Sequence, residues 1–176
     1  MGIDFELKGK KVLVTGAGQG VGKGIAQLLA DAGAAVVVND FVGERAEEVV
    51  DEIKKAGGDA KAAPFDVTDI AAVTAAIKAV GGVDVLINNA GIAPPRNELK
   101  TDINMANQMK RMEGRYDELE PGNFTVDLSD EQWDRMIKIH LYGTFYGTRA
   151  ALRHMTPQRF GSIVNISSIM GLRPAA

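Results

Sequence analysis

Short apolar runs alternate with stretches of helical periodicity, and this alternation constrains the fold more than any other feature of the chain. The apolar runs are continuous, which is typical of strands buried on both faces of a parallel sheet. Right-handed crossovers then favour an α/β, Rossmann-like doubly wound parallel sheet with helices on both faces. The predicted strands lie at residues 11–16, 34–40, 60–67, 83–91 and 161–168. The predicted helices lie at residues 20–33, 43–58, 69–82 and 129–155.

The composition excludes several classes of protein. The chain has 176 residues, of which 45% are hydrophobic, enough for one globular domain with a real core. The net charge is −3 with no basic block, so nucleic acid is not an expected partner. No apolar run approaches the ~20 residues of a membrane span, and the polar start does not resemble a signal peptide. With no cysteine for disulfides or thiolate chemistry, we expect a cytoplasmic protein.

One stretch, from about residue 92 to 128, interrupts the alternation and contains no clear strand. Apolar residues recur in it at three- and four-residue steps, at Met105, Met109, Met112, Tyr116 and Leu119. This spacing predicts an inserted amphipathic helix from Thr101 to Leu119, within a single domain of residues 1–176. The helix either packs on the surface or serves as a lid or partner contact. Ser129 and Gln132 have the spacing of a capping box for the next helix.

Glycine occupies every second position from Gly16 to Gly24, where the first predicted strand passes into the first predicted helix. The spacing fits neither the P-loop nor the GxGxxG fingerprint, but it fits TGxxxGxG, starting at Thr15. The amide groups of a helix N-terminus attract a diphosphate, and a purely structural turn is the alternative. The predicted cofactor-binding residues of this loop are Gly16, Ala17, Gly18, Gln19, Gly20, Val21 and Gly22.

Asp40 ends the second predicted strand, where an acid accepts hydrogen bonds from the adenosine ribose hydroxyls of a dinucleotide. Its charge would repel the 2′-phosphate of NADP. An Arg or Lys at position 19, 39 or 41 would be needed to bind that phosphate. These positions are occupied by Gln19, Asn39 and Phe41. The sequence therefore favours NAD as cofactor, with Asp40 and Phe41 in its site. The alternative is an ordinary exposed Asp at a strand end.

Four motifs in order, "TGAGQGVG", "FDV", "NNAG" and "GSIVNISS", together resemble the short-chain dehydrogenase/reductase family. The resemblance covers nearly the whole chain except the insert. It implies an NAD(P)-dependent oxidoreductase that interconverts hydroxyl and carbonyl groups. It also implies that Asp66 and Val67 contact the adenine ring and that Asn88 steadies the central strand. The residues that would line the cofactor cleft are Asn89, Ala90 and Gly91.

Ser168 matches the family's catalytic serine, which would hydrogen-bond the substrate oxygen and stabilise its developing charge. We reject Ser167, because strand alternation would point it to the other side of the sheet. Seven residues after Trp133 the family usually has Asn, and here the residue is His140. This variation resembles the hydroxyacyl-CoA dehydrogenase branch, as does "VVVND". His140 either organises a water-linked proton path or is a buried, satisfied histidine.

The family's general acid/base is a tyrosine of a YxxxK motif, about thirteen residues beyond the serine. From Ser168 that position lies past the last residue, and the present tyrosines, Tyr116, Tyr142 and Tyr146, have no Lys four residues later. We therefore expect an amino-terminal portion of the fold, truncated after the fifth strand and inactive by itself. The alternatives are a dinucleotide-binding protein without catalysis and one half of a split enzyme.

The complete reaction implied by the resemblance moves a hydride between nicotinamide C4 and a secondary alcohol or ketone. The expected partner is a small-molecule substrate, with a hydroxyacyl thioester as one candidate. The apolar segment "SIVNI" would lie at an open sheet edge. Because such an edge invites pairing with another chain, we expect a homo-oligomer.

Overall fold

The computed structural model describes residues 6–93, 98–123 and 125–168. The chain divides into two compact units, and each is described by itself. One unit consists of Met1–Gly91 with Lys138–Ala176, and the other of Ile92–Ile137.

The first unit contains a parallel sheet of five strands in the order β3-β2-β1-β4-β5. The strands are β1 (Lys11–Val14), β2 (Ala35–Val38), β3 (Asp59–Ala62), β4 (Val85–Asn88) and β5 (Ser162–Asn165). β1 is central, and its Val12 pairs with Val36 of β2 on one side and Val85 of β4 on the other. The predicted doubly wound parallel sheet is confirmed, and β5 is the outermost strand on its side among the described residues.

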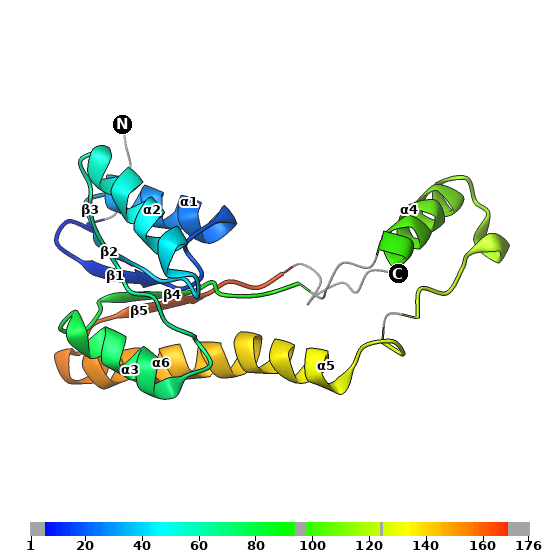
Figure 1. The fold of residues 1–176 in the computed structure, drawn as a ribbon. Helices are drawn as coiled ribbons and strands as arrows, with labels where there is room; N and C mark the ends of the chain where they lie inside the picture. Colours follow the sequence, from blue (N-terminus) through cyan, green and yellow to red (C-terminus); the bar gives the residue numbers. More distant parts are fainter. Residues whose placement is uncertain (1–5, 94–97, 124, 169–176) are drawn as a thin grey trace. The chain divides into compact units, whose positions relative to one another are not determined.

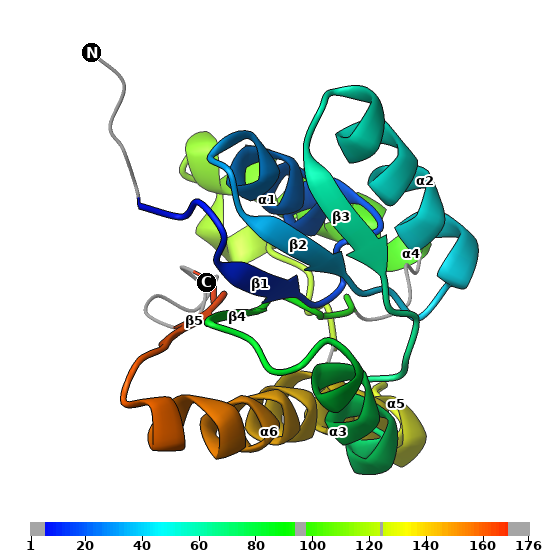
Figure 2. The ribbon, with the colours of Figure 1, turned by 90° about the vertical axis from the view of Figure 1, so that its left-hand side faces the viewer.

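Helices cover both faces of this sheet. They are α1 (Gly20–Asp31), α2 (Gly43–Lys55), α3 (Ile70–Ala79) and α6 (Gly143–Gln158). Figures 1 and 2 show α1 and α2 on one face and α3 and α6 on the other. Alternate residues of β1 enter the two cores: Val12 and Val14 pack toward α1 and α2, and Leu13 toward α3 and α6. The strands read as continuous apolar runs because both of their faces are buried.

The strands end earlier than the sequence predicts, and β3 shows the physical reason. The predicted strand over 60–67 stops at Ala62, although the Ala63 amide still donates to Val38 O at 2.9 Å. Pro64 follows, and proline has no amide hydrogen with which to continue the ladder. The chain therefore leaves the sheet at this residue and forms the loop that leads to α3.

The predicted helix over 129–155 is interrupted. It consists of α5 (Asp130–Ile137), the π-helical turn η2 (Lys138–Tyr142) and α6. The capping box before α5 is confirmed, since Ser129 N donates to Gln132 Oε1 at 3.1 Å and Gln132 N donates to Ser129 Oγ at 3.2 Å.

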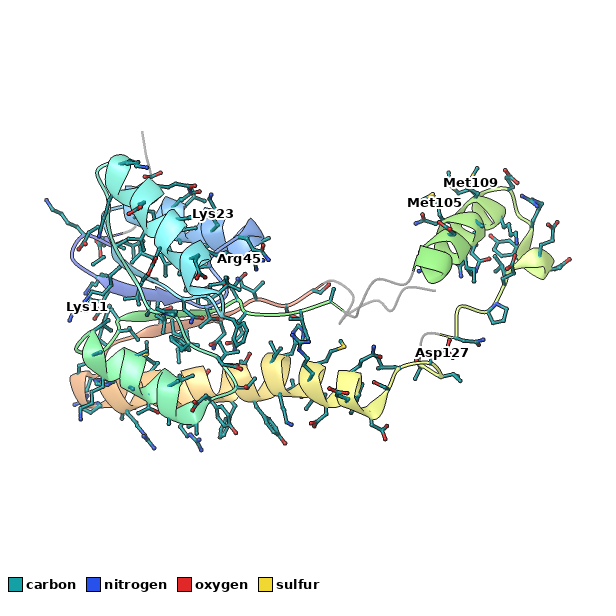
Figure 3. All side chains as sticks on the ribbon, in the orientation of Figure 1. Lys11, Lys23, Arg45, Met105, Met109 and Asp127 are labelled. Carbon is teal, nitrogen blue, oxygen red and sulfur yellow. The ribbon has the colours of Figure 1, made fainter. Side chains whose placement is uncertain are left out.

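The second unit contains the predicted insert helix with shifted bounds: α4 (Glu98–Met112), followed by a 3-10 turn at Tyr116–Glu118. Gly114 has a φ of +74°, and Arg115 N donates to Lys110 O at 2.8 Å, which ends the helix before Tyr116. Asn107 is 5% exposed and joins α4 to the following loop through both atoms of its amide. Met105 and Met109, labelled on α4 in Figure 3, are 61% and 58% exposed. Whether this face covers a substrate or a partner stays a prediction.

Within the described ranges, none of the helices is both long and apolar enough to cross a membrane.

The cap of α3 provides a test of local stability. Asp69 Oδ1 accepts from the amides of Ala71 at 2.8 Å and Ala72 at 3.1 Å. We expect Asp69→Ala to lower the free energy of unfolding by about 1 kcal/mol, because two amides of the first turn lose their acceptor. Urea denaturation followed by circular dichroism measures the change. Asp51→Ala, at an exposed site in the middle of α2, is the control and should stay within about 0.5 kcal/mol of the parent. Equal losses in both variants would contradict the cap's role.

Candidate functional site

The turn between β1 and α1 has a backbone that requires glycine. Gly16 has a φ of +61°, and a Cβ at this position would lie 2.8 Å from the Cα of Ala90. Its amide donates to Asn39 Oδ1 at 3.3 Å, and the Ala17 amide donates to Asn39 O at 2.6 Å. The end of β2 therefore holds the first half of the glycine loop.

Asp40 holds the second half of the loop. Its Oδ2 accepts from Gly18 N at 3.1 Å, and its Oδ1 accepts from Val42 N at 3.0 Å. A Cβ at Gly18 would lie 2.7 Å from Asp40 Oδ2 and 2.6 Å from Arg45 Cβ, so this position has no room for a side chain. Asp40 is 7% exposed, which rules out the reading as an ordinary exposed Asp at a strand end. Phe41, the next residue, is 75% exposed.

The segment after β4 is tied to the same loop. Asn89 Nδ2 donates to Thr15 O at 2.9 Å and to Gly16 O at 3.1 Å. The amides of Asn89 and Ala90 donate to Thr15 Oγ1 at 3.0 and 3.1 Å. A Cβ at Gly22 would overlap Asn89 Nδ2 and Gly16 O. The close approach of α1 to the end of β4 therefore depends on Gly22.

The segment after β3 is held from two sides. Phe65 N donates to Asp40 O at 3.3 Å, which joins it to the end of β2. Asp66 Oδ1 accepts from Thr68 N at 2.8 Å and shapes the turn that leads to α3. Val67 packs on the start of α6, where a Cβ at Gly143 would lie 2.8 Å from Val67 Cγ2.

His140 lies in the π-helical turn, and its ring packs on the end of β4. A Cβ at Gly91 would lie 2.7 Å from His140 Cε1 and 3.2 Å from its Nδ1. The backbone oxygen of His140 accepts from Thr144 Oγ1 at 2.8 Å. His140 is exposed, so the alternative of a buried histidine is wrong.

Ser168 is exposed and lies beyond the end of β5 at Asn165. The alternation argument used to reject Ser167 therefore does not apply, because neither serine is part of the strand. Within the sheet, Asn88 Nδ2 donates to Asn165 Oδ1 at 2.8 Å and to Thr148 Oγ1 at 3.2 Å. These bonds join β4 to β5 and α6. The expected role of Asn88 in steadying the central strand stays a prediction.

The structure thus brings most of the predicted residues to one edge of the sheet, at the carboxyl ends of the strands (Figure 1). Ligands of open α/β sheets bind at this edge. Among the residues that the structure describes, no group of three or more His, Asp or Glu side chains could hold a metal ion.

Three residues that shape this edge were missed as site residues by sequence reasoning. Thr15 entered only as part of a spacing, although its hydroxyl accepts from two amides. Asn39 was considered only because it is not an Arg or Lys, although it is 1% exposed and its side chain forms hydrogen bonds to two loops. Arg45 comes from the first turn of α2, where Figure 3 labels it, and its Cβ lies beside Gly18. A polar residue inside an apolar run was the available signal for Asn39.

Comparison with known proteins agrees with this geometry. The family model described as short chain dehydrogenase matches residues 10–113 and 119–176. The 2,5-dichloro-2,5-cyclohexadiene-1,4-diol dehydrogenase LinX of Sphingobium indicum is 36% identical over 174 residues, which cover 97% of this chain and 59% of that protein.

Two solved structures share the fold. A 3-oxoacyl-[acyl-carrier protein] reductase with bound NAD from Brucella melitensis has a TM-score of 0.77 and 29% identity, over 96% of this chain and 56% of that one. A gluconate 5-dehydrogenase from Burkholderia cenocepacia, in complex with NADP and tartrate, has a TM-score of 0.71 and 34% identity, over 97% and 57%.

The present chain spans somewhat more than half the length of these relatives, so their complete activities are not carried over to it. The family-model match extends over both the glycine loop and the segment that ends in Ser168. On the combined ground of motifs, fold and this match, the chain belongs to the short-chain dehydrogenase family.

Proposed function

We propose that this chain forms the dinucleotide-binding part of an NAD-dependent oxidoreductase that interconverts a secondary alcohol and a ketone. The observation that carries the proposal is the locked glycine loop, whose Gly18 amide donates to the buried carboxylate of Asp40. A bound dinucleotide would supply the hydride acceptor or donor.

The residues present fit such a cofactor. The absence of side chains at Gly16 and Gly18 lets the loop backbone lie close against its neighbours, and α1 begins directly after it at Gly20. The free amides of this helix end would bind the diphosphate. Asp66 and Val67 would contact the adenine ring, and Asn89, Ala90 and Gly91 would line the cofactor cleft. The remaining loop residues Ala17, Gln19, Val21 and Gly22 complete the proposed set.

Asp40 supports NAD rather than NADP. Each of its carboxylate oxygens accepts one backbone amide, and a carboxylate has about four acceptor sites. The remaining sites would accept ribose hydroxyls, while the negative charge would repel a 2′-phosphate. The two solved relatives hold different cofactors, NAD in one and NADP in the other, so this preference belongs to the proposal.

Ser168 would donate a hydrogen bond to the substrate oxygen and stabilise its charge in the transition state. His140, exposed in the π-helical turn and packed on Gly91, would organise a water-linked proton path. None of the tyrosines in the 176 residues is followed four residues later by lysine. We therefore assign the proton transfer to a tyrosine that this sequence does not contain.

The substrate class stays broad. The names of the relatives refer to a cyclic diol, a 3-oxoacyl carrier protein and gluconate, which share a hydroxyl or carbonyl group at the reacting carbon. A small alcohol or ketone, including a hydroxyacyl thioester, is consistent with this range.

We also propose that the protein is a homo-oligomer and works in the cytoplasm. Its apolar surface supports self-association. Leu141, Phe145 and Leu152 recur at helical spacing and are 59%, 54% and 45% exposed. On the outermost strand, Val164 is 42% exposed. A second copy of the chain would remove this apolar area from water.

The cofactor preference can be tested directly. We expect NAD to bind at least about tenfold more tightly than NADP, a difference of about 1.4 kcal/mol. Asp40→Asn combined with Phe41→Arg should narrow or reverse the difference, because the amide keeps one acceptor for the loop while the charge is removed. Isothermal titration calorimetry measures both affinities. Equal affinities in the parent chain would contradict the role of Asp40.

The glycine loop offers a matched pair of substitutions. Gly18→Ala should weaken NAD binding by at least about tenfold, because its Cβ would lie 2.7 Å from Asp40 Oδ2 and displace the carboxylate. Gly24→Ala is the control, since a Cβ there meets nothing within 4 Å. It should leave the affinity unchanged and raise helix stability by about 0.5–1 kcal/mol. A comparable loss of affinity in both variants would argue against the locked loop.

The activity of the chain by itself provides a third test. We expect the 176-residue polypeptide to bind NAD weakly and to oxidise no alcohol, because the loss of a general acid/base lowers rates by roughly 10²–10⁴-fold. Supplying a YxxxK segment, in cis or as a second chain, should restore the activity. NADH formation is followed across secondary alcohols and 3-hydroxyacyl thioesters. Robust turnover by the 176-residue chain, its mass confirmed, would refute this assignment of the proton transfer.

A further inference from the structure

Asn39 is a buried polar residue whose side chain bridges two loops. It is 1% exposed. Its amide nitrogen donates to the carbonyl oxygens of Ala63 and Phe65, both at 3.0 Å. Its amide oxygen accepts from Gly16 N at 3.3 Å. One side chain therefore joins the glycine loop after β1 to the loop after β3.

The two bridged loops carry different parts of the proposed adenosine site. The loop that begins at Gly16 would bind the diphosphate, and the chain continues from Phe65 directly into Asp66 and Val67. Asp40, which would bind the ribose, follows Asn39 in sequence. Asn39 is therefore bonded to the loops proposed to bind the diphosphate and the adenine ring, and it is adjacent in sequence to the residue proposed to bind the ribose.

We propose that Asn39 is a positioning residue for the adenosine half of the dinucleotide. It sets the spacing between the diphosphate loop and the adenine loop and does not touch the ligand itself. This inference rests on the proposed dinucleotide site.

The chemistry of the position explains why asparagine serves here. The two carbonyl oxygens need donors and the Gly16 amide needs an acceptor, and a side-chain amide supplies both. A carboxylate could not donate, and an apolar side chain could do neither. The backbone bonds of Asn39, to Val14 O and from Ala17 N, do not depend on its side chain. A substitution therefore removes the bridge between the loops but keeps the pairing of β2 with β1.

The test compares Asn39→Ala and Asn39→Leu with the parent chain. Calorimetric titrations use NAD and ADP, which lacks the nicotinamide half. We expect the Kd of NAD to rise about tenfold, the Kd of ADP to rise by the same factor, and the number of sites per chain to stay unchanged. A merely destabilised protein would instead lose sites at an unchanged Kd, because only its folded fraction binds.

Asn107→Ala is the matched control. Asn107 is 5% exposed and also bonds backbone groups through both amide atoms, Glu120 O at 2.7 Å and Glu120 N at 3.0 Å. It belongs to the insert, and its replacement should leave the Kd of NAD within about twofold of the parent value.

The outcomes separate this inference from the proposed function. If the parent chain binds NAD and both Asn39 variants bind it with the parent's Kd, the inference is wrong and the dinucleotide site stands. A loss of sites at unchanged Kd would also refute the inference. Absence of binding by the parent chain would refute the site and the inference together.

A measurement on the unmodified chain covers the case in which both variants fail to fold. Binding of inorganic diphosphate, which would contact the glycine loop and not the adenine loop, should slow amide hydrogen exchange in residues 15–20 and also in residues 63 and 65–67, because the bridge couples the two loops. Slowing confined to one of these segments would overturn the inference.

Discussion

The turn between β1 and α1 has backbone amides that neither a strand ladder nor a helix can satisfy, and the proposed site depends on how they are paired. Buried amides without partners are costly, so side chains from other segments must supply the acceptors. Asn39 accepts from Gly16, and Asp40 accepts from Gly18. From the other side, Asn89 donates to the carbonyl oxygens of the same turn. The loop conformation is therefore set by the ends of β2 and β4 rather than by its glycines alone.

Much of the fold could be predicted because its signals are local. Continuous apolar runs marked the strands, and the Ser129–Gln132 spacing marked a helix start that the hydrogen bonds confirm. The misjudged features depend on other signals. Pro64 ends β3 early, Gly114 ends the insert helix early, and the π-helical turn at Lys138–Tyr142 replaces regular helix where the His140 ring packs on Gly91. Apolar periodicity does not distinguish a π-helical turn from a regular one.

The candidate site could be predicted only in part, since its residue types were visible but their partners were not. Asp40 was predicted to bind the ribose, whereas its bonds to the amides of Gly18 and Val42 join residues that only the fold brings together. Thr15 and Asn39 were missed for the same reason. The Thr15 hydroxyl and the Asn39 amide bond backbone groups of the protein's own loops. A family motif draws attention to residues that touch a ligand, so it did not point to these two.

The second role that we propose for Asp40 would link cofactor choice to loop structure. Its two oxygens already accept hydrogen bonds from the amides of Gly18 and Val42. The same carboxylate would also accept hydrogen bonds from the ribose hydroxyls. Removing the charge to admit a 2′-phosphate also weakens the acceptor that keeps the Gly18 amide in place. Arg45 Cβ and the Asp40 carboxylate both lie where a Cβ of Gly18 would point, so this part of the loop packs closely against α2 as well as against Asp40. A change of cofactor at this site therefore requires a replacement that keeps an oxygen acceptor in position while it gives up the charge.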